Sequence, residues 1–246
     1  MKAITTNPIT SSQYCRKRAP AGPVREAMAI AQSHLMMRWR CRTISFSIPA
    51  ALACQVRVLS ERQIQQGWQP GYSLQEIHTS VSRLVATSVL KTESWSVIQP
   101  QIGTQPLHTW RPGNPRPDTW RLSQACRSRW NRCPSSIQVF QTTELAGRLF
   151  GARAGHVTRL IEQRHDLLLA QVFVLYRTLL PELASCWVGE NALPMAERGV
   201  KNPDAFLMDT EGVPRRVIES AGAYSQTQVD TFHEYCRVSR LPYELW

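Results

Sequence analysis

Three carboxylates in the C-terminal half of the sequence, Glu190, Asp204 and Glu219, fall near the ends of short segments that we expect to be β-strands. Asp204 precedes the apolar segment 205–208, and Glu219 ends the segment 216–219. Strand ends can gather carboxylates at one edge of a sheet, and Mg²⁺ prefers oxygen ligands and activates water for hydrolysis. The sequence therefore predicts a candidate Mg²⁺ site at Asp204 and Glu219, with Glu190 as a third candidate catalytic residue. The alternative is that these carboxylates meet only solvent or a neighbouring arginine.

The segment 73–89 predicts a helix with one apolar and one polar face. Ser73 and Glu76 have the spacing of a capping box, in which each side chain accepts a hydrogen bond from the backbone amide of the other residue. Apolar residues such as Ile77 and Val81 then recur at helical spacing. A helix that enters the major groove needs a polar outer face on an apolar base. The candidate DNA contacts on that face are Gln75, His78, Thr79, Ser82 and Arg83.

We expect this helix to belong to a winged helix over residues 46–134. Helical spacing runs from Pro49 to Gln66, and a glycine-containing turn separates it from the capped helix. Alternating residues over 89–111 then predict a two-stranded hairpin, the wing. A further helix is expected over 118–132. Candidate phosphate contacts in this second part are Arg111, Arg121 and Arg127.

Residues 135–246 are expected to form a second, α/β domain. Helices are predicted to begin near Thr143, to cover about 157–180 and to cover 226–238, with short apolar strands before the last of them. Helices and strands in such succession are typical of a layered structure. The expected fold class is therefore α+β, an N-terminal winged helix followed by an α/β domain.

His165 and Asp166 are neighbours on the long predicted helix. Adjacent residues on a helix point in different directions, so we expect no ready-made catalytic dyad there. A partly buried, hydrogen-bonded histidine is the preferred interpretation of His165.

The charge of the chain favours a polyanionic partner. The formal net charge is +11, and it is unevenly distributed: residues 1–160 carry a net charge of +15 and residues 161–246 a net charge of −4. Lysine and arginine neutralise the phosphates of nucleic acids, so double-stranded DNA is the expected partner. Residues 1–45, rich in arginine and serine, are expected to form a basic, disordered arm.

The remaining composition points to a reduced compartment. The seven cysteines are scattered and contain no Cys-x-x-Cys pair, which favours free thiols and a cytoplasmic location. No stretch approaches the ~20 apolar residues that cross a bilayer, so no membrane partner is expected. A second copy of the chain, forming a homodimer, is a further candidate partner.

Several short sequence blocks occur in the order found in a known family. The blocks are Lys-Asn-Pro-Asp-Ala-Phe-Leu (201–207), Arg-Val-Ile-Glu-Ser-Ala-Gly-Ala-Tyr (216–224), Phe-His-Glu-Tyr-Cys (232–236) and Leu-Pro-Tyr-Glu-Leu-Trp (241–246). With His165-Asp166 and Trp-Val-Gly-Glu (187–190), they resemble the replication-relaxation proteins over about residues 45–246. The resemblance implies a winged helix coupled to a domain similar to the restriction-endonuclease fold, in a protein of a plasmid or integrative mobile element.

One position departs from the nuclease pattern that the resemblance implies. That pattern is Pro-Asp followed by Glu-x-Lys, and the residue two after Glu219 is Ala221, while Lys201 lies before the Pro-Asp pair. We therefore expect a DNA-binding protein that acts in replication, relaxation or mobilisation. The alternatives are a metal-dependent nuclease that uses Asp204 and Glu219, a winged-helix transcription regulator, and a protein-docking adaptor.

Overall fold

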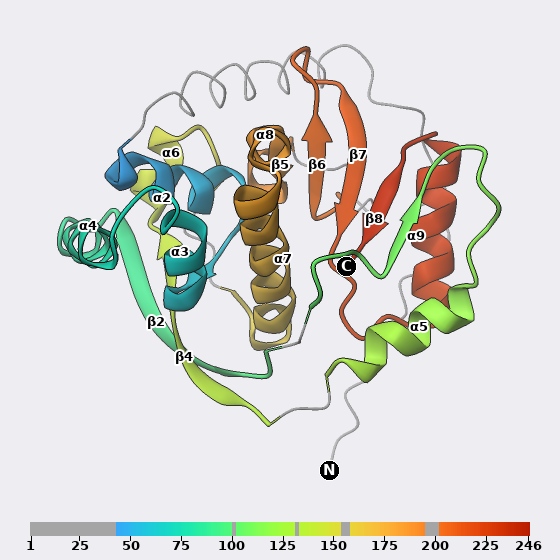
Figure 1. Ribbon diagram of the computed structural model, residues 1–246, viewed down its shortest axis with the longest axis horizontal. Helices are drawn as coiled ribbons and strands as arrows, with labels where there is room; N and C mark the ends of the chain where they lie inside the picture. The colour runs from blue at the N-terminus through green and yellow to red at the C-terminus, as the bar shows by residue number, and fades with distance from the viewer. Residues whose placement is uncertain (1–42, 100–101, 131–132, 154–157, 195–201) are drawn as a thin grey trace.

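The computed structural model describes residues 43–99, 102–130, 133–153, 158–194 and 202–246 (Figure 1). It mixes helices with two β-sheets, which confirms the expected α+β class. The helices are α2 (Ile44–Cys54), α3 (Glu61–Trp68), α4 (Leu74–Ala86), α5 (Thr119–Ser128), α6 (Glu144–Leu149), α7 (Leu160–Leu179), α8 (Pro181–Ser185), the 3₁₀ turn η2 (Glu190–Ala192) and α9 (Gln226–Val238). The strands are β1 (Leu59–Ser60), β2 (Leu90–Val97), β3 (His108–Trp110), β4 (Ser135–Thr142), β5 (Trp187–Gly189), β6 (Ala205–Met208), β7 (Pro214–Glu219) and β8 (Tyr243–Leu245).

Helices α2, α3 and α4 lie beside a three-stranded antiparallel sheet with strand order β1-β4-β2 (Figure 1). Strands β2 and β4 pair along their whole length, from Leu90 opposite Thr142 to Val97 opposite Ser135. Short β1 adds to the other edge of β4. The elements of this part follow one another in the chain as α2, β1, α3, α4, β2 and β4, with β3 and α5 between β2 and β4 in the sequence.

The partner of β2 differs from the one expected. We predicted a hairpin within 89–111, but β3 pairs with β8 in the second sheet, and β2 pairs with β4. Residues between β2 and β4 therefore leave the first sheet and return to it. The boundary expected at 134/135 does not separate the two sheets, because β4 lies beyond it and is the central strand of the first sheet.

The helix expected from Pro49 to Gln66 is two helices. Helix α2 ends at Cys54, and α3 begins at Glu61 after the short strand β1. The physical reason is a capping box: Ser60 accepts from the backbone amide of Gln63 (3.3 Å), and the Gln63 side chain accepts from the amide of Ser60 (2.9 Å). Pro49 lies inside α2 rather than at its start. Ile44, placed in the basic arm by the sequence, already belongs to α2, whereas residues 1–42 lie outside the described residues.

The second sheet has five strands in the order β3-β8-β7-β6-β5. Strands β5, β6 and β7 are antiparallel neighbours, and β8 runs parallel to β7 after the crossover through α9. Side chains alternate across the sheet: Leu207 and Ile218 pack in the cluster that contains α7, and Phe206 and Val217 pack with α5 and α9. The strands expected at 205–208 and 216–219 and the helix expected at 226–238 are confirmed.

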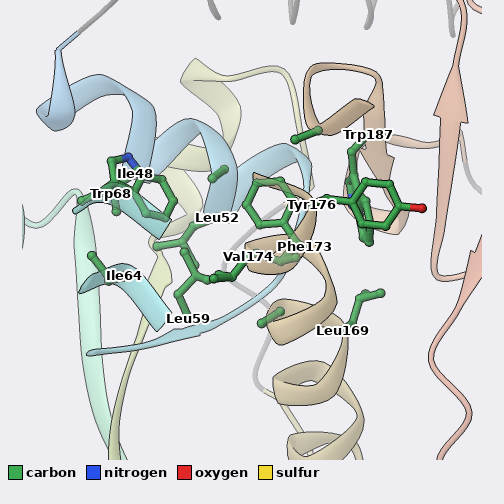
Figure 2. Packing of buried hydrophobic residues seen from close by; sticks show 14 of the residues in the cluster. Ile48, Leu52, Leu59, Ile64, Trp68, Leu169, Phe173, Val174, Tyr176 and Trp187 are labelled. Carbon is green, nitrogen blue, oxygen red and sulfur yellow. The ribbon is translucent and has the colours of Figure 1, made fainter. Parts of the chain in front are cut away.

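Helix α7 joins the two sheets through a continuous core (Figure 2). Phe173 and Val174 are fully buried in the same apolar cluster as Leu52 and Ile64, from α2 and α3. The cluster continues to Trp187 on β5, whose ring meets Phe173 edge-on at a centroid distance of 5.6 Å. Helix α4 also packs into this cluster, so one core is shared by the helices beside the first sheet and by the second sheet.

The C-terminal end of α2 packs closely against β5. The backbone oxygen of Gln55 accepts from the indole of Trp187 (2.9 Å), and the Gln55 amide donates to Ala184 (3.2 Å). A Cβ added at Gly189 would lie 2.2 Å from the Gln55 oxygen, so only glycine fits there.

Within the described residues, no helix combines the length and apolar character needed to span a membrane.

Candidate functional site

The polar face of α4 is exposed over its whole length. The capping box expected at its start is present: the Ser73 hydroxyl accepts from the Glu76 amide (3.3 Å), and the Glu76 carboxylate accepts from the Ser73 amide (2.8 Å). Hydrogen bonds from the Ser73 side chain and backbone lower the pKa of Glu76. Ile77, Val81 and Leu84 are buried beneath the helix. The start and the rotation of α4 are therefore both fixed.

All five candidate residues on α4 are exposed. Gln75, Thr79, Ser82 and Arg83 recur at helical spacing on the outward face. His78 turns toward α3, where its Nε2 lies 3.3 Å from the Gln65 amide nitrogen. The outward face thus offers amide, hydroxyl and guanidinium groups, the types that read base edges in a DNA groove.

The β2–β4 ribbon next to α4 has a polar outer surface. The Gln138 side chain donates to the Thr92 hydroxyl (3.1 Å), and the hydroxyls of Ser94 and Ser136 lie 3.0 Å apart. These cross-strand pairs are exposed. They make the ribbon a hydrophilic extension of the surface that α4 presents.

The other candidate DNA contacts lie on a different part of the molecule. Arg111 follows β3, and Arg121 and Arg127 are on α5, which packs against α9. All three are exposed, and α5 lies on the other side of α7 from α4 (Figure 1). Arg121 is close to Asp118, the residue that caps α5 (3.4 Å). The structure therefore does not bring these arginines onto the α4 surface.

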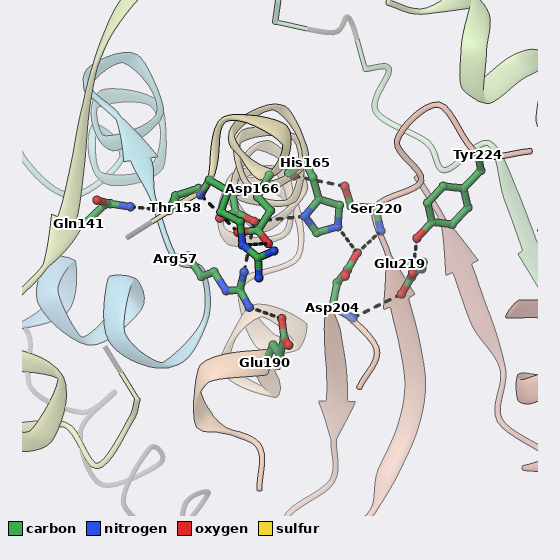
Figure 3. Close-up of polar contacts among 12 residues, drawn as sticks. Arg57, Gln141, Thr158, His165, Asp166, Glu190, Asp204, Glu219, Ser220 and Tyr224 are labelled. Atoms are coloured by element: carbon green, nitrogen blue, oxygen red, sulfur yellow. Dashed lines mark hydrogen bonds and ion pairs between the residues drawn. The ribbon is translucent and has the colours of Figure 1, made fainter. Parts of the chain in front are cut away.

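Asp204 and Glu219 meet between β6 and β7, as expected from their positions at strand ends. The Glu219 carboxylate accepts from the backbone amide of Asp204 (3.3 Å), and the Asp204 carboxylate accepts from the amide of Ser220 (2.7 Å). Tyr224 donates its hydroxyl to Glu219 (2.6 Å) (Figure 3). Asp204 and Glu219 are each only 1% exposed.

His165 bridges two carboxylates (Figure 3). Its Nε2 lies 2.9 Å from Asp204, and its Nδ1 lies 3.1 Å from Asp166. The side chains of His165 and Asp166 do meet although the two residues are neighbours on α7, whereas the expectation that they form no ready-made catalytic dyad stays a prediction. The expectation of a partly buried, hydrogen-bonded His165 is confirmed, since a quarter of its side chain is exposed.

The Glu190 carboxylate does not join those of Asp204 and Glu219, although the Glu190 backbone amide donates to the Asp204 carbonyl oxygen (3.1 Å). It forms an ion pair with Arg57 (2.5 Å), whose guanidinium also lies 3.9 Å from Asp166. Arg57 and Tyr224 were not among the candidate site residues in the sequence. Arg57 meets Glu190 across more than 100 residues, which no local pattern indicates. Nothing in the residues next to Tyr224 distinguishes it from any other tyrosine in a loop. The cluster thus ties the loop after α2 to α7 and to the second sheet.

The carboxylate cluster does not fit a Mg²⁺ ion of the nuclease type. In the part of the chain that the structure describes, no three histidine, cysteine, aspartate or glutamate side chains are arranged to hold a metal. One oxygen of Asp204 and both oxygens of Glu219 accept from protein donors, whereas Mg²⁺ requires several carboxylate, water or phosphate oxygens in octahedral geometry. Ala221 is fully buried at the position of the nuclease lysine, and Lys201 lies outside the described residues.

No protein-family description, no curated protein and no solved structure matches this chain.

Proposed function

We propose that this chain binds double-stranded DNA, with α4 in the major groove and the β2–β4 ribbon as the wing of a winged helix. The order helix, strand, helix, helix and strand from α2 to β2 supports the proposal, as does the position of α4 after a turn that follows α3; the second strand of the ribbon, β4, follows after β3 and α5. The exposed polar face of α4, fixed by its cap and by the buried residues beneath it, is the observation that carries the proposal. The net charge of +11 favours a polyanion.

The setting we propose is the replication, relaxation or mobilisation of a plasmid or integrative element. This part rests on the sequence blocks shared with replication-relaxation proteins. The order of α7, β5, β6, β7, α9 and β8 agrees with the layered second domain that the resemblance implies.

The metal-dependent nuclease is not part of the proposal. Asp204 and Glu219 are buried and hydrogen-bonded to the protein itself, so neither is placed to receive a phosphodiester and an attacking water. We assign the cluster a positioning role: it holds α7 against β6 and β7, and through Arg57 it holds the loop after α2. That role keeps the first sheet and its helices in a fixed place.

The test is the affinity of the full chain for a short labelled duplex, measured by fluorescence anisotropy. The affinity should fall steeply between about 50 and 200 mM salt, because phosphate contacts release counterions. Arg83→Ala should weaken binding by about 1 kcal/mol or more. Arg215→Ala, which removes the same charge from the second sheet, is the matched control and should leave the affinity unchanged.

Two results would contradict the proposal. An affinity for the duplex that does not change with salt would show that phosphate contacts do not hold the complex, and would favour the protein-docking alternative. Equal losses in Arg83→Ala and Arg215→Ala would show a general effect of charge, with no special part for α4.

A further inference from the structure

A hollow with a basic lining lies between the loop after β3 and the C-terminal end of α9. Its volume is 460 Å³, within the range of sites that bind small molecules. Its lining includes Trp110, Asn114 and His233, the three arginines Arg116, Arg237 and Arg240, and the acidic residue Glu234. Helix α9, which supplies part of this lining, lies on the other side of α7 from α4 (Figure 1).

Three arginines line the hollow, and two of them have acidic partners. Arg116 pairs with Asp230 (2.6 Å), and Arg237 pairs with Glu234 through two hydrogen bonds (2.7 and 2.6 Å). Arg240 forms no ion pair with any residue in the described part of the chain. Each paired guanidinium keeps further N–H donors, but its charge is offset by its carboxylate partner, so the unbalanced positive charge of the lining is that of Arg240.

The imidazole of His233 is part of the same wall. Burial, and next to it the charge of Arg116, lowers the pKa of His233. Its Nδ1 lies 3.1 Å from the Tyr243 hydroxyl, and its ring meets Trp110 edge-on at 5.1 Å. A neutral, held imidazole adds polar surface to the hollow without adding an acidic group.

Arg240 occupies the position after the C-terminal end of α9, where helices commonly have a glycine. Helix α9 ends with the Leu241 amide donating to Cys236 (2.9 Å) and the Arg240 amide donating to Arg237 (3.2 Å), the pattern in which the residue after the helix turns left-handed. The φ of Arg240 is +53°, a conformation that is strained for a residue with a Cβ. Ser88, which follows α4, has a similar φ of +56°, and the consequence of this conformation at Arg240 is that glycine can replace the arginine without backbone strain.

We propose that the hollow binds a phosphate group, with Arg240 as its principal ligand and Arg116 and Arg237 beside it. Guanidinium groups recognise phosphate through paired, charge-assisted hydrogen bonds. The phosphate belongs either to a nucleic-acid strand or to a small phosphorylated molecule, since the same donors serve both. This site is separate from α4 and does not rest on the proposed DNA contact of that helix.

The test uses Arg240→Gly in the full chain. Glycine removes the charge and also relieves the left-handed strain, so the melting temperature should equal or exceed that of the parent protein. Calorimetric titration with inorganic phosphate should show binding by the parent and about a tenfold loss in the variant. Arg215→Gln is the matched charge control, and Arg83→Ala should also leave phosphate binding unchanged.

A second titration identifies the source of the phosphate. A 5′-phosphorylated dinucleotide that binds more tightly than both inorganic phosphate and its unphosphorylated counterpart indicates a strand end. No gain over inorganic phosphate indicates a small phosphorylated molecule, and either result supports the site.

Three outcomes overturn the proposal. They are no binding of inorganic phosphate by the parent protein, equal binding by the parent and Arg240→Gly, and equal binding by acetate at matched ionic strength. If Arg240→Gly proves less stable than the parent, Arg116→Gln decides, and unchanged phosphate affinity in that variant also overturns the proposal. If Arg83→Ala loses affinity for the duplex but still binds inorganic phosphate, the α4 surface and the hollow are two separate sites.

Discussion

The polar residues of α4 and those around His165 differ in their exposure to solvent and in their hydrogen-bond partners. On α4 the polar side chains face solvent, and the helix is held by its cap and by apolar residues on its other face. Around His165 the polar groups are mostly buried and use one another as partners. Polar groups that are already satisfied stabilise a fold, whereas exposed ones remain able to bind something else. The comparison therefore assigns recognition to the first region and positioning to the second.

The largest effect should follow from Asp204→Ala. The substitution leaves the His165 imidazole and the Ser220 amide without their buried acceptor, and each polar group left unsatisfied in this way costs about 1–3 kcal/mol. Urea unfolding of the variant and the parent measures this loss. A change in the free energy of unfolding below about 1 kcal/mol would mean that the cluster does not position α7. The contrast drawn between the two regions would then be wrong.

A second variant tests the contact between the two halves. Gly189→Ala places a methyl group against the Gln55 backbone, and overpacking of this kind costs about 1–3 kcal/mol. The matched control is Gly222→Ala, where an added Cβ has no neighbour within 4 Å. Similar unfolding free energies for the two variants would show that the end of α2 can move away from β5.

A smaller effect is expected at the cap of α4. Ser73→Ala removes the acceptor for the Glu76 amide, and loss of an N-cap costs about 1 kcal/mol. Thermal unfolding followed by circular dichroism measures the change. Because α4 is the proposed recognition helix, the affinity for DNA should fall together with the stability. An unchanged affinity would show that DNA binding does not depend on an ordered first turn of α4.

The smallest effect is expected from Arg127→Ala. This residue lies on α5, away from α4, and charges separated by more than about 8 Å are largely screened at physiological salt. Affinity for a short duplex should change by less than about 0.5 kcal/mol. A loss as large as that of Arg83→Ala, in the same anisotropy assay, would show that one ligand covers both surfaces.

Local signals in the sequence were sufficient for much of the fold. The Ser73–Glu76 box marks the start of α4, and short apolar segments mark β6 and β7, because helix caps and strand patterns depend on neighbouring residues. The same reasoning would have separated α2 from α3, since Ser60 and Gln63 form an equally readable box.

The missed features depend on long-range pairing. Nothing local to β2 shows that its partner begins at Ser135 instead of near Leu107, because strand register is decided by the packing of both strands. At the site, the meeting of Asp204 and Glu219 followed from strand ends, but the role of His165 did not. Its contact with Asp166 depends on side-chain rotamers, and its contact with Asp204 depends on where α7 crosses the sheet.

The route of the chain between β2 and β4 has a consequence for how the protein can be divided. After β2 the chain contributes β3 and α5 to the far side of the molecule before it returns as the middle strand of the first sheet. A fragment that stops at residue 134 would lack that middle strand, and its β2 edge would be left open for pairing with other molecules. The two halves should consequently unfold in a single transition, and trimming either one should yield aggregates in place of a smaller working unit.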